Sequence, residues 1–345
     1  MENLASYTTL SLGGPAREFA EATSAEQLVS LIADADRNAV PTLVLGGGSN
    51  VVVADEGFDG LVIKVATEGV TVSRDGEQAV VTVEAGEDWD RLVARAVAEG
   101  WSGIECMSGV PGQVGSTPIQ NVGAYGQEVS QTVRCVRAYD RLTRQVIDLE
   151  ARQCGFSYRD SVFKRDLSRY VVLAVTYALD LSELSGPVAY AELAARLDTV
   201  AGGRVPLARA RETVLALRRG KGMVLDPDDP DTRSAGSFFT NPILTAEEAE
   251  ELAVRAPGHP RWDVPGGLIK VPAAWLIEQA GYPKGYERGP ARISTKHTLA
   301  LTNPTGRATT ADLLALAREV RDGVREKFGV TLVNEPVLVG CALDD

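Results

Sequence analysis

The stretch TLVLGGGSNVVVADEG, from Thr42 to Gly57, sets three consecutive glycines directly after an apolar segment. A Rossmann-type dinucleotide fingerprint would need glycines where Ser49 and Val51 stand, and it would open a helix at this point. Instead, the β-branched run that starts at Val51 favours a second strand. A glycine loop between two strands can converge backbone N–H groups on an anion, or it can be a tight hairpin without a ligand. This loop alone leaves both interpretations open.

A second glycine-rich stretch, SGVPGQVGSTPIQNVGAYG from Ser108 to Gly126, carries five glycines among hydroxyl and amide side chains. Long loops inside compact domains are usually functional, and this one is rich in groups that donate hydrogen bonds. Two such loops in neighbouring α+β units suit a long ligand with a pyrophosphate in its middle. Flavin adenine dinucleotide (FAD) is the obvious candidate for that ligand.

The composition argues against several classes of partner. With 345 residues, of which 44% are hydrophobic and 24% charged, the chain is expected to form a soluble protein of two or three domains. The formal net charge of −12 argues against a general affinity for nucleic acid. We expect no membrane partner, because no apolar run reaches membrane-spanning length and the N-terminus lacks the pattern of a signal peptide.

Cysteine and histidine usage is typical of a cytoplasmic protein without a metal site. His259, which precedes Pro260, is expected in a solvated loop and His297 in a strand, rather than in catalysis. The cysteines are scattered and form no C-x-x-C pair, which predicts buried, reduced thiols rather than a zinc site or a disulfide framework. They are Cys106, Cys135, Cys154 and Cys341.

Periodicity and turn signals predict strands and helices that alternate with unequal connections, which is typical of the α+β class. The segment GKGMVLDPDDPDTRSAG, from Gly220 to Gly236, has the composition of a linker and predicts a domain boundary. Helices are expected at 24–37, 88–98, 191–200, 206–219, 273–280 and 311–328, with one more beginning at Ala246. Strands are expected at 42–45, 51–54, 61–65, 79–84, 133–140, 145–149, 170–179 and 298–302.

Five segments follow one another along the chain: VLGGGSN, SGVPGQVGSTPIQNVGAYGQE, YRDSVFK, GSFFTNP and NEPVLVG. In these segments, and over about residues 9–340, the chain resembles the UDP-N-acetylenolpyruvoylglucosamine reductase (MurB) family of peptidoglycan synthesis. Its length and the segment around Tyr190 resemble type I of that family. The resemblance implies an FAD-binding fold of the vanillyl-alcohol-oxidase (PCMH) type in two subdomains, at 1–66 and 67–222. It further implies a C-terminal α+β substrate-binding domain at 223–328 and a tail at 329–345 that returns toward the flavin site.

The resemblance also implies a chemistry. FAD would be bound non-covalently, NADPH would donate hydride, and the UDP-sugar enolpyruvyl ether UDP-N-acetylglucosamine enolpyruvate would become UDP-N-acetylmuramate. Such a reaction supplies peptidoglycan precursors in the cytoplasm and so serves cell wall biogenesis, cell shape, the cell cycle and cell division. The cofactor-binding positions fall on Gly46, Gly47, Gly48, Ser49, Asn50, Pro111, Gly112, Gly115, Ser116, Gln120, Asn121, Gly123, Ala124, Tyr125 and Arg159. The substrate-binding positions fall on Tyr190, Lys221, Asn241 and Gln279, and no metal ligand is implied.

Three residues in these motifs are expected to carry the reaction: Arg159, Ser237 and Glu335. Hydride delivered to the methylene carbon leaves negative charge on the adjacent carbon and its carboxylate, and a fixed positive charge stabilises it. By resemblance, Arg159 supplies that charge with Glu335 as its partner, and Ser237 donates the proton to the adjacent carbon. The plainer alternatives are an ion pair of Arg159 with Asp160, a turn cap at Ser237 and a solvated Glu335 before Pro336.

Two further hypotheses belong to different classes. One keeps the flavin but makes the protein an oxidase of a small alcohol or lactone, in which flavin is commonly attached through histidine or cysteine. Only Cys106 lies at the edge of a glycine-rich loop. The other is a regulatory module that binds a nucleotide sugar or phosphate without a redox cofactor.

Phe238 and Phe239 are expected in the hydrophobic core rather than against a cofactor.

Overall fold

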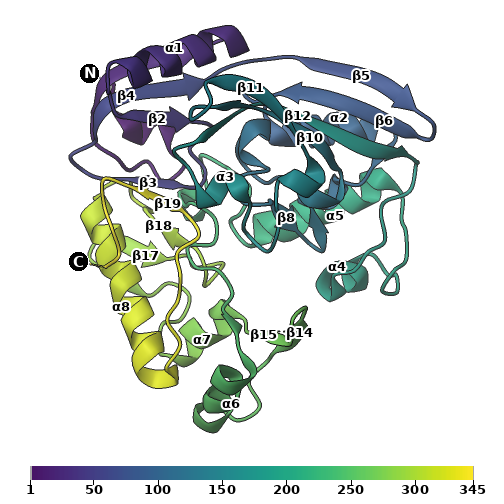
Figure 1. Cartoon of the computed structure of the whole chain (residues 1–345). Coiled ribbons are helices and arrows are strands. Elements are labelled where there is room, and N and C mark those ends of the chain that lie inside the picture. The colour runs from purple at the N-terminus through teal and green to yellow at the C-terminus, as the bar shows by residue number, and fades with distance from the viewer. Residues whose placement is uncertain (1, 345) are drawn as a thin grey trace. The chain divides into compact units, whose positions relative to one another are not determined.

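The computed structural model describes residues 2–344 and divides them between two compact units (Figure 1). The first unit holds residues 16–48 and 59–220 together with Glu2, and the second holds residues 3–15, 49–58 and 221–344. The chain leaves the first unit after Gly220, where the predicted linker begins. It also leaves the first unit between Gly48 and Ser49, inside the first glycine-rich loop. Residues 49–58, which the sequence led us to group with the N-terminal subdomain, therefore belong to the second unit.

One sheet of the first unit has three strands and is covered by an amphipathic helix. Helix α1 begins at Ser24, whose hydroxyl accepts a hydrogen bond from Gln27 N at 3.2 Å, so its predicted N-terminus is confirmed. The helix buries Leu28 and Ile32 in a cluster with Ile63 of the sheet. The strand order is β1 (Ala16–Ala22), β4 (Phe58–Val65) and β2 (Thr42–Leu45), and α1 spans Ala25–Arg37.

The larger sheet of the first unit is antiparallel along its whole path. It joins β11 (Gln145–Glu150), β10 (Val133–Asp140), β12 (Tyr170–Leu181), β6 (Gln78–Glu84) and β5 (Val70–Asp75) in that order, and β7 (Trp101–Ser102) pairs with β12. Helix α2 (Trp89–Ala98) packs on this sheet, and the rings of Trp89 and Tyr177 lie 5.8 Å apart in the core. This sheet carries the second glycine-rich loop between β7 and β10.

The remaining elements of the first unit are short, apart from one helix. A hairpin of two-residue strands, β8 (Gly123–Ala124) and β9 (Gln127–Glu128), lies within the second glycine-rich loop. The helices are α3 (Val162–Arg165), α4 (Ala191–Arg196) and α5 (Leu207–Gly220). Single 3-10 turns occur at Glu105–Met107, Val114–Ser116, Val129–Gln131 and Ala151–Gln153.

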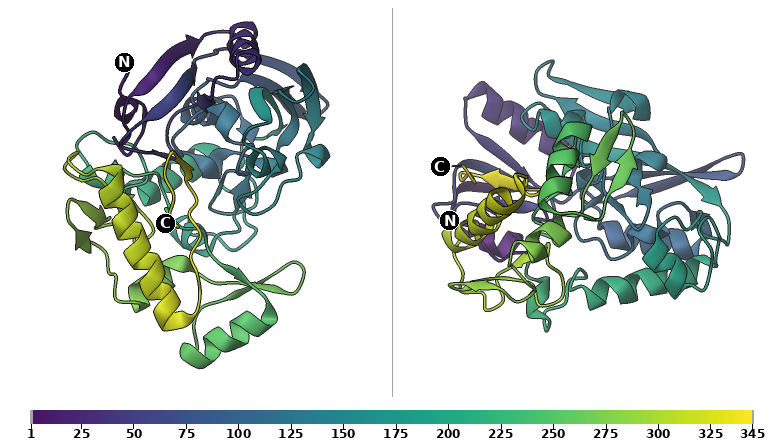
Figure 2. Two further views of the ribbon diagram at one scale, coloured as in Figure 1. Left: turned by 60° about the vertical axis from the view of Figure 1, so that its left-hand side comes forward. Right: turned by 90° about the horizontal axis from the view of Figure 1, so that it is seen from below.

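The second unit combines small sheets with three helices (Figures 1 and 2). One sheet has the order β13 (Ile243–Leu244), β15 (Leu268–Lys270), β14 (Trp262–Val264), and another β16 (Glu287–Arg288), β17 (Ala291–Ile293), β18 (Leu301–Thr302). The helices are α6 (Ala246–Arg255), α7 (Ala273–Gln279) and α8 (Thr310–Phe328), and a 3-10 turn spans Leu4–Tyr7. Near the C-terminus, β19 (Val337–Val339) pairs in parallel with β3 (Val51–Val53), the strand that follows the first glycine-rich loop.

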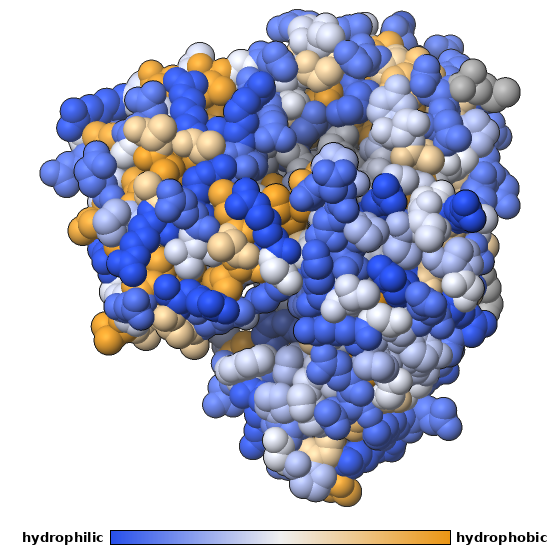
Figure 3. Space-filling view, turned by 180° about the vertical axis from the view of Figure 1, so that it is seen from behind, coloured by the Kyte–Doolittle hydropathy of each residue, from blue (hydrophilic) through white to orange (hydrophobic). Residues whose placement is uncertain are grey.

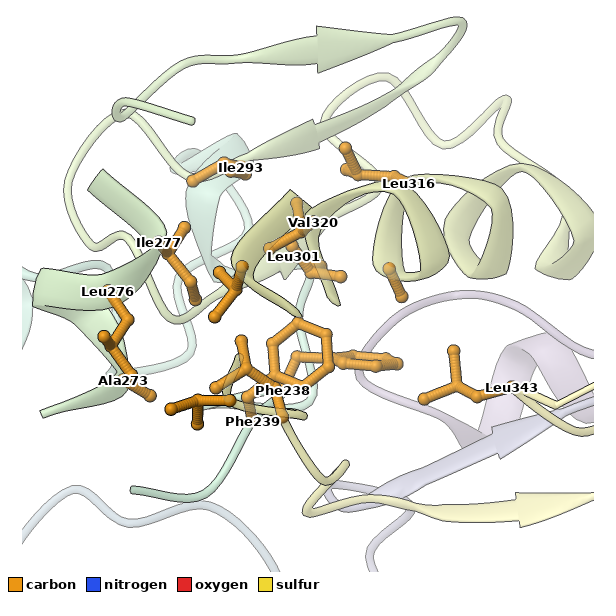
Figure 4. Close-up of a cluster of buried hydrophobic side chains, with 14 of the residues drawn as sticks. Phe238, Phe239, Ala273, Leu276, Ile277, Ile293, Leu301, Leu316, Val320 and Leu343 are labelled. Atoms are coloured by element: carbon orange, nitrogen blue, oxygen red, sulfur yellow. The ribbon is translucent and has the colours of Figure 1, made fainter. Parts of the chain in front are cut away.

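The core of the second unit gathers side chains from all three helices (Figure 4). Phe238 and Phe239 point into it beside Leu276, Ile277 and Leu301. Each phenylalanine is only 1% exposed, and their rings meet edge to face with centroids 5.1 Å apart. The prediction that both belong to the core is therefore confirmed. Because they follow Ser237 directly, the core fixes the chain on one side of that residue.

Some predicted elements are shorter than expected. The helix at 191–200 ends at Arg196, because Asp198 adopts a left-handed conformation with φ 49°, which a helix cannot continue. The strand at 298–302 is reduced to its last two residues. The chain before it turns, with Ser294 Oγ accepting hydrogen bonds from Lys296 N and His297 N. The predicted strand position of His297 is therefore wrong.

His259 also differs from its prediction. It lies in a loop, but it is buried with 6% of its surface exposed rather than solvated. Its Nδ1 lies 3.1 Å from Ala256 O, and its ring is 6.4 Å from that of Trp275. Packing against the aromatic core of the second unit decides its burial.

The face of the molecule in Figure 3 is mainly hydrophilic, with hydrophobic residues in patches. The exposed large hydrophobic residues of the chain include Leu142, Val200 and Val254. None of the helices between residues 2 and 344 has the length and apolar character needed to cross a bilayer.

Candidate active site

The two glycine-rich loops of the first unit lie directly against each other. A Cβ atom added at Gly47 would lie 2.8 Å from Gly112 Cα, and one added at Gly46 would lie 2.7 Å from Ser116 Oγ. Real Cβ atoms do not approach backbone this closely, so Gly47 requires glycine, whereas a side chain at Gly46 would displace the Ser116 hydroxyl. Gly48 closes the first loop with φ 63°. At Gly47 and Gly112 the two loops thus meet backbone to backbone, and such backbone can approach a ligand closely.

Gln113, which the sequence analysis did not single out, connects the second loop to β4 and to the turn that follows β6. Its Nε2 donates hydrogen bonds to Val65 O at 3.0 Å and to Gly86 O at 2.9 Å. Its Oε1 is buried and accepts no hydrogen bond from any residue between 2 and 344. That oxygen would lie 3.2 Å from a Cβ added at Gly46. The loop contact therefore holds one buried acceptor that a ligand can satisfy.

The far end of the second loop is shaped by left-handed backbone. Tyr125 and Gly126, with φ 49° and 88°, form the two-residue turn between β8 and β9, and a turn with both central φ positive suits such hairpins. Asn121 also has a positive φ, 46°, and is 1% exposed. Its side chain donates to Glu128 Oε2 at 2.8 Å and Ser157 O at 3.0 Å, and it accepts from Ser130 N. All the hydrogen-bonding groups of this side chain thus have protein partners, so Asn121 shapes the loop.

Arg159 lies on a two-residue turn closed by hydrogen bonds between Ser157 and Asp160. Its φ of 54° is in the left-handed region, which costs an arginine about 1 kcal/mol or more. Lys164 Nζ donates to the Arg159 carbonyl at 3.0 Å and helps to hold this turn. The Arg159 guanidinium donates to Gly123 O at 2.9 Å and to Asn121 O at 3.4 Å. The structure therefore joins Arg159 to the second glycine-rich loop, and Asp160 pairs instead with Arg165.

Tyr190 packs edge to face on Tyr125, with ring centroids 5.4 Å apart and Tyr190 46% exposed. Arg218, on α5, is a further basic group near Tyr125 that the sequence analysis missed, although it precedes Lys221 by three residues. Burial lowers the pKa of Arg218 to about 10, against the opposing influence of Tyr125 and Asp90. Its guanidinium is therefore still positively charged at neutral pH, near Tyr125.

In the second unit, three distant segments meet next to Ser237. Phe238 O accepts a hydrogen bond from Glu335 N at 2.8 Å, and Phe239 forms an antiparallel bridge with Asn334. Asn50 joins them, with its Nδ2 3.4 Å from Glu335 O and its carbonyl accepting from Val337 N at 3.0 Å. The structure thus brings Asn50 and Glu335 together with the chain beside Ser237, and both Ser237 and Glu335 are half-buried.

Two of the candidate substrate-binding residues lie at opposite ends of one helix. Asn241 Oδ1 accepts a hydrogen bond from Ala273 N at 2.9 Å and so caps the start of α7. Gln279 is the last residue of α7 and is exposed, and its carbonyl accepts from Lys327 Nζ. The structure does not bring these two residues together. Lys221 opens the linker at the start of the C-terminal part of the second unit.

The other candidate residues divide between the same two units. Those of the first unit are Pro111, Gly115, Gln120 and Ala124, and Ser49 belongs to the second. Gly115 is required by packing, since a Cβ added there would lie 2.6 Å from Ala85 Cβ. Within residues 2–344, no group of three or more histidine, cysteine, aspartate or glutamate side chains is arranged to hold a metal ion.

Comparison with protein families matches two parts of the chain. Residues 16–145 match an FAD binding domain, and residues 228–339 match the C-terminal domain of UDP-N-acetylenolpyruvoylglucosamine reductase (MurB). The first match contains both glycine-rich loops, and the second contains Ser237 and Glu335. The part of the chain that carries both glycine-rich loops therefore matches an FAD binding domain.

Relatives cover nearly the whole chain. The UDP-N-acetylenolpyruvoylglucosamine reductase of Thermobifida fusca is 58% identical over 352 aligned residues, covering 99% of this chain and 97% of the relative. The reductase of Salinispora arenicola is 56% identical, and the alignment covers 99% of this chain and 95% of that relative. Among solved structures, UDP-N-acetylenolpyruvylglucosamine reductase (MurB) from Thermus caldophilus is 27% identical with a TM-score of 0.66, covering 98% of this chain and 97% of that one.

Proposed function

The chain belongs to the UDP-N-acetylenolpyruvoylglucosamine reductase (MurB) family, and from this premise we propose that it reduces UDP-N-acetylglucosamine enolpyruvate to UDP-N-acetylmuramate with FAD and NADPH. The identity of 58% to a reductase of this family, over 99% of the chain, carries the proposal. The protein is thus an FAD-dependent oxidoreductase of peptidoglycan precursor synthesis. We place the reaction in the cytoplasm, where it would support cell wall biogenesis, cell shape and division.

The residues of the first unit fit FAD. The touching glycines, Gly47 and Gly112, keep side chains away from the loop contact, and Gln113 Oε1 is a buried acceptor left for a ligand group. Backbone N–H groups of these loops can hold the pyrophosphate. Bound FAD supplies hydride transfer between NADPH and the substrate. A transiently bound nicotinamide needs no domain of its own, which agrees with the lack of a Rossmann fingerprint.

Arg159 is proposed to stabilise the negative charge that develops on the substrate when hydride reaches its methylene carbon. Its guanidinium is oriented by the carbonyls of Asn121 and Gly123, and its backbone is held in the turn by Lys164. A group fixed in this way needs no reorganisation when charge develops. The arginine side chain also presents a planar fork that matches a carboxylate.

Ser237 is proposed to donate the proton that completes the reduction, to the carbon adjacent to the carboxylate. A hydroxyl is a weak acid, so its alkoxide has to be stabilised by neighbouring groups. The backbone hydrogen bond from Glu335 N to Phe238 O supports a shared site, since it holds the segments of Ser237 and Glu335 next to each other. We propose that Glu335, in its protonated form, donates a hydrogen bond to the substrate carboxylate.

The UDP part of the substrate would be bound by Tyr190, Lys221, Asn241 and Gln279. Lys221 supplies positive charge for the diphosphate, and the exposed ring of Tyr190 supplies a surface for contact. Asn241 has its Oδ1 occupied by the cap of α7, so its Nδ2 is the group that would donate to the substrate. Gln279, at the other end of α7, would contact a different part of the ligand.

The oxidase alternative is not favoured. The relatives with 58% and 56% identity are reductases, and the match at residues 228–339 is to the reductase C-terminal domain. Cys106, the cysteine nearest a glycine-rich loop, is 2% exposed, and burial raises its pKa to about 12. Its thiol is un-ionised at neutral pH and therefore poorly suited to covalent attachment of flavin.

The flavin itself provides the test of this proposal. Purified protein should show the visible absorbance of flavin, and anaerobic NADPH should bleach it. Addition of UDP-N-acetylglucosamine enolpyruvate, still without oxygen, should restore the absorbance. The proposal is wrong if oxygen reoxidises the reduced flavin and this substrate does not. A preparation without flavin bands that cannot be reconstituted with FAD would favour the regulatory-module alternative.

A further inference from the structure

A buried carboxylate lies in the linker of the second unit, in a 3-10 turn at Pro230–Thr232. Asp231 is 3% exposed. Its Oδ1 accepts hydrogen bonds from Thr295 N at 3.0 Å and Arg292 Nη2 at 3.4 Å, and its Oδ2 accepts from Thr295 Oγ1 at 2.5 Å. Burial acts to raise the pKa of Asp231, but these hydrogen bonds and the Arg292 charge bring it below its ordinary value. The carboxylate is therefore ionised, and it ties the linker to the connection between β17 and β18.

The segment that carries Lys221 packs on the same residue. Gly222 has φ 65°, and a Cβ added there would lie 3.0 Å from Asp231 Cβ and 3.4 Å from Asp231 O. The chain directly after Lys221 therefore rests on Asp231. A change in the position of Asp231 would move that segment as well.

The segment that leads to Ser237 is held by β18, by the residue after it and by the connection between β17 and β18. Arg233 O accepts from Asn303 N at 3.0 Å, and Ser234 forms an antiparallel bridge with Thr302. Directly after Ser237, Phe238 N donates to Leu299 O at 2.7 Å. The connection at 294–300 thus contacts Asp231 through Thr295 and the chain next to Ser237 through Leu299.

We propose that Asp231 is a positioning residue for substrate reduction. It fixes the segments of Lys221 and Ser237 to the connection at 294–300 and so sets the position of one segment relative to the other. This inference rests on the proposed function, in which Lys221 binds substrate and Ser237 donates a proton. A buried carboxylate suits this role because it accepts several hydrogen bonds at once, and buried charges are retained only where such partners exist. Asp231 itself does not touch the reacting atoms.

The test separates the two halves of the reaction in the holoenzyme. Asp231→Asn keeps the shape of the side chain but replaces one acceptor oxygen with an amide, and Asp231→Ala removes both oxygens. Reduction of the flavin by NADPH should stay within about twofold of wild type. Reoxidation by UDP-N-acetylglucosamine enolpyruvate should slow by about 10- to 100-fold, the effect of small misplacement of reacting groups, and more in the alanine variant. The KM for this substrate should rise, whereas the KM for NADPH should not.

Asp228→Asn is the matched control, because Asp228 lies in the same linker but is exposed. It should match wild type in both half-reactions. If Asp231→Asn matches wild type in both, or slows both equally, the inference is overturned. If it does not accumulate as folded flavoprotein, Thr295→Val, which removes one donor to Asp231, is measured by the same criteria. A wild-type enzyme that the substrate fails to reoxidise would overturn the proposed function and this inference together, whereas failure of the variant alone overturns only this inference.

Discussion

The glycine-rich loops of the first unit are shaped by backbone conformation, whereas the surroundings of Ser237 in the second unit are shaped by pairing of distant segments. In the loops, glycines at direct backbone contacts and positive φ values at Asn121 and Tyr125 set the path of the chain. Directly after Ser237, the chain is held by two hydrogen bonds of Phe238, whose N donates to Leu299 O and whose O accepts from Glu335 N. The Asn50 side chain and Glu335, which also meet there, are 285 residues apart in the sequence.

The two regions differ in this way because their proposed roles differ. A cofactor with phosphates needs backbone N–H groups and close approach, which local glycines provide. Proton donation needs a side chain fixed to a fraction of an ångström, which a packed core provides. Phe238 and Phe239 anchor Ser237 in such a core. Substitutions in the two regions should therefore damage different steps.

Loss of the Ser237 hydroxyl should have the largest effect. In Ser237→Ala, reoxidation of the reduced flavin by substrate should slow by about 10²- to 10⁴-fold, because the proton donor is missing. Reduction by NADPH should be nearly unchanged. Anaerobic stopped-flow absorbance of the flavin measures both steps. Equal losses in the two steps would instead mean that Ser237 has a structural role.

Arg159→Lys should have the next largest effect. Lysine keeps the positive charge but cannot donate to the Gly123 and Asn121 carbonyls while presenting a fork to a carboxylate. We expect the substrate half-reaction to slow by about 10²-fold, as for loss of one oriented donor. Arg165→Lys is a suitable control, since Arg165 lies in the same motif and pairs with Asp160 on an exposed surface. Normal turnover in Arg159→Lys would remove Arg159 from the mechanism.

Gly47→Ala should act on the cofactor region alone. Its new Cβ would lie 2.8 Å from Gly112 Cα, so the loops have to separate at a strain of about 1–3 kcal/mol. Affinity for FAD should fall by roughly 5- to 100-fold, as fluorescence titration of apoprotein with FAD can measure. Gly220→Ala is the control, because nothing lies within 4 Å of a Cβ added at Gly220. Unchanged affinity in Gly47→Ala would contradict the described loop contact.

Asp55→Ala should have the smallest effect, on stability. Asp55 accepts hydrogen bonds from Thr310 N at 2.7 Å and Ala311 N at 2.9 Å, and it so connects the segment after β3 to the start of α8. Loss of such a cap lowers the free energy of unfolding by about 1 kcal/mol. Denaturant unfolding of the holoenzyme measures this change in the free energy of unfolding. Asp59→Ala, which breaks an exposed pair with Arg17, should change stability by less than about 0.5 kcal/mol, and an equal loss in both variants would argue against the cap.

Local signals predicted much of the first region. Two glycine-rich loops and the capping serine of α1 are recognisable because each depends on residues close together in the chain. Gln113 was missed because its importance lies in contacts with Val65 and Gly86, which belong to other strands and turns.

The second region was harder to predict from sequence. Ser237 and Glu335 came from family motifs, as did Arg159 in the first unit, and no local pattern indicates that Glu335 pairs with the chain beside Ser237. Nor does local pattern show that residues 49–58 belong to the second unit, since parallel pairing of β3 with β19 is a tertiary contact. Asp231 looked like one of several charges in a linker, and only its burial distinguishes it from Asp228.

The central claim, reduction of an enolpyruvyl ether by NADPH through FAD, is tested most directly by the stoichiometry of turnover without oxygen. Purified holoenzyme is mixed with NADPH and UDP-N-acetylglucosamine enolpyruvate under anaerobic conditions, and the nucleotide sugar is identified by mass spectrometry. The account predicts that NADPH is consumed and UDP-N-acetylmuramate formed in equal amounts. Consumption of NADPH without this product, or turnover only after oxygen is admitted, would contradict it.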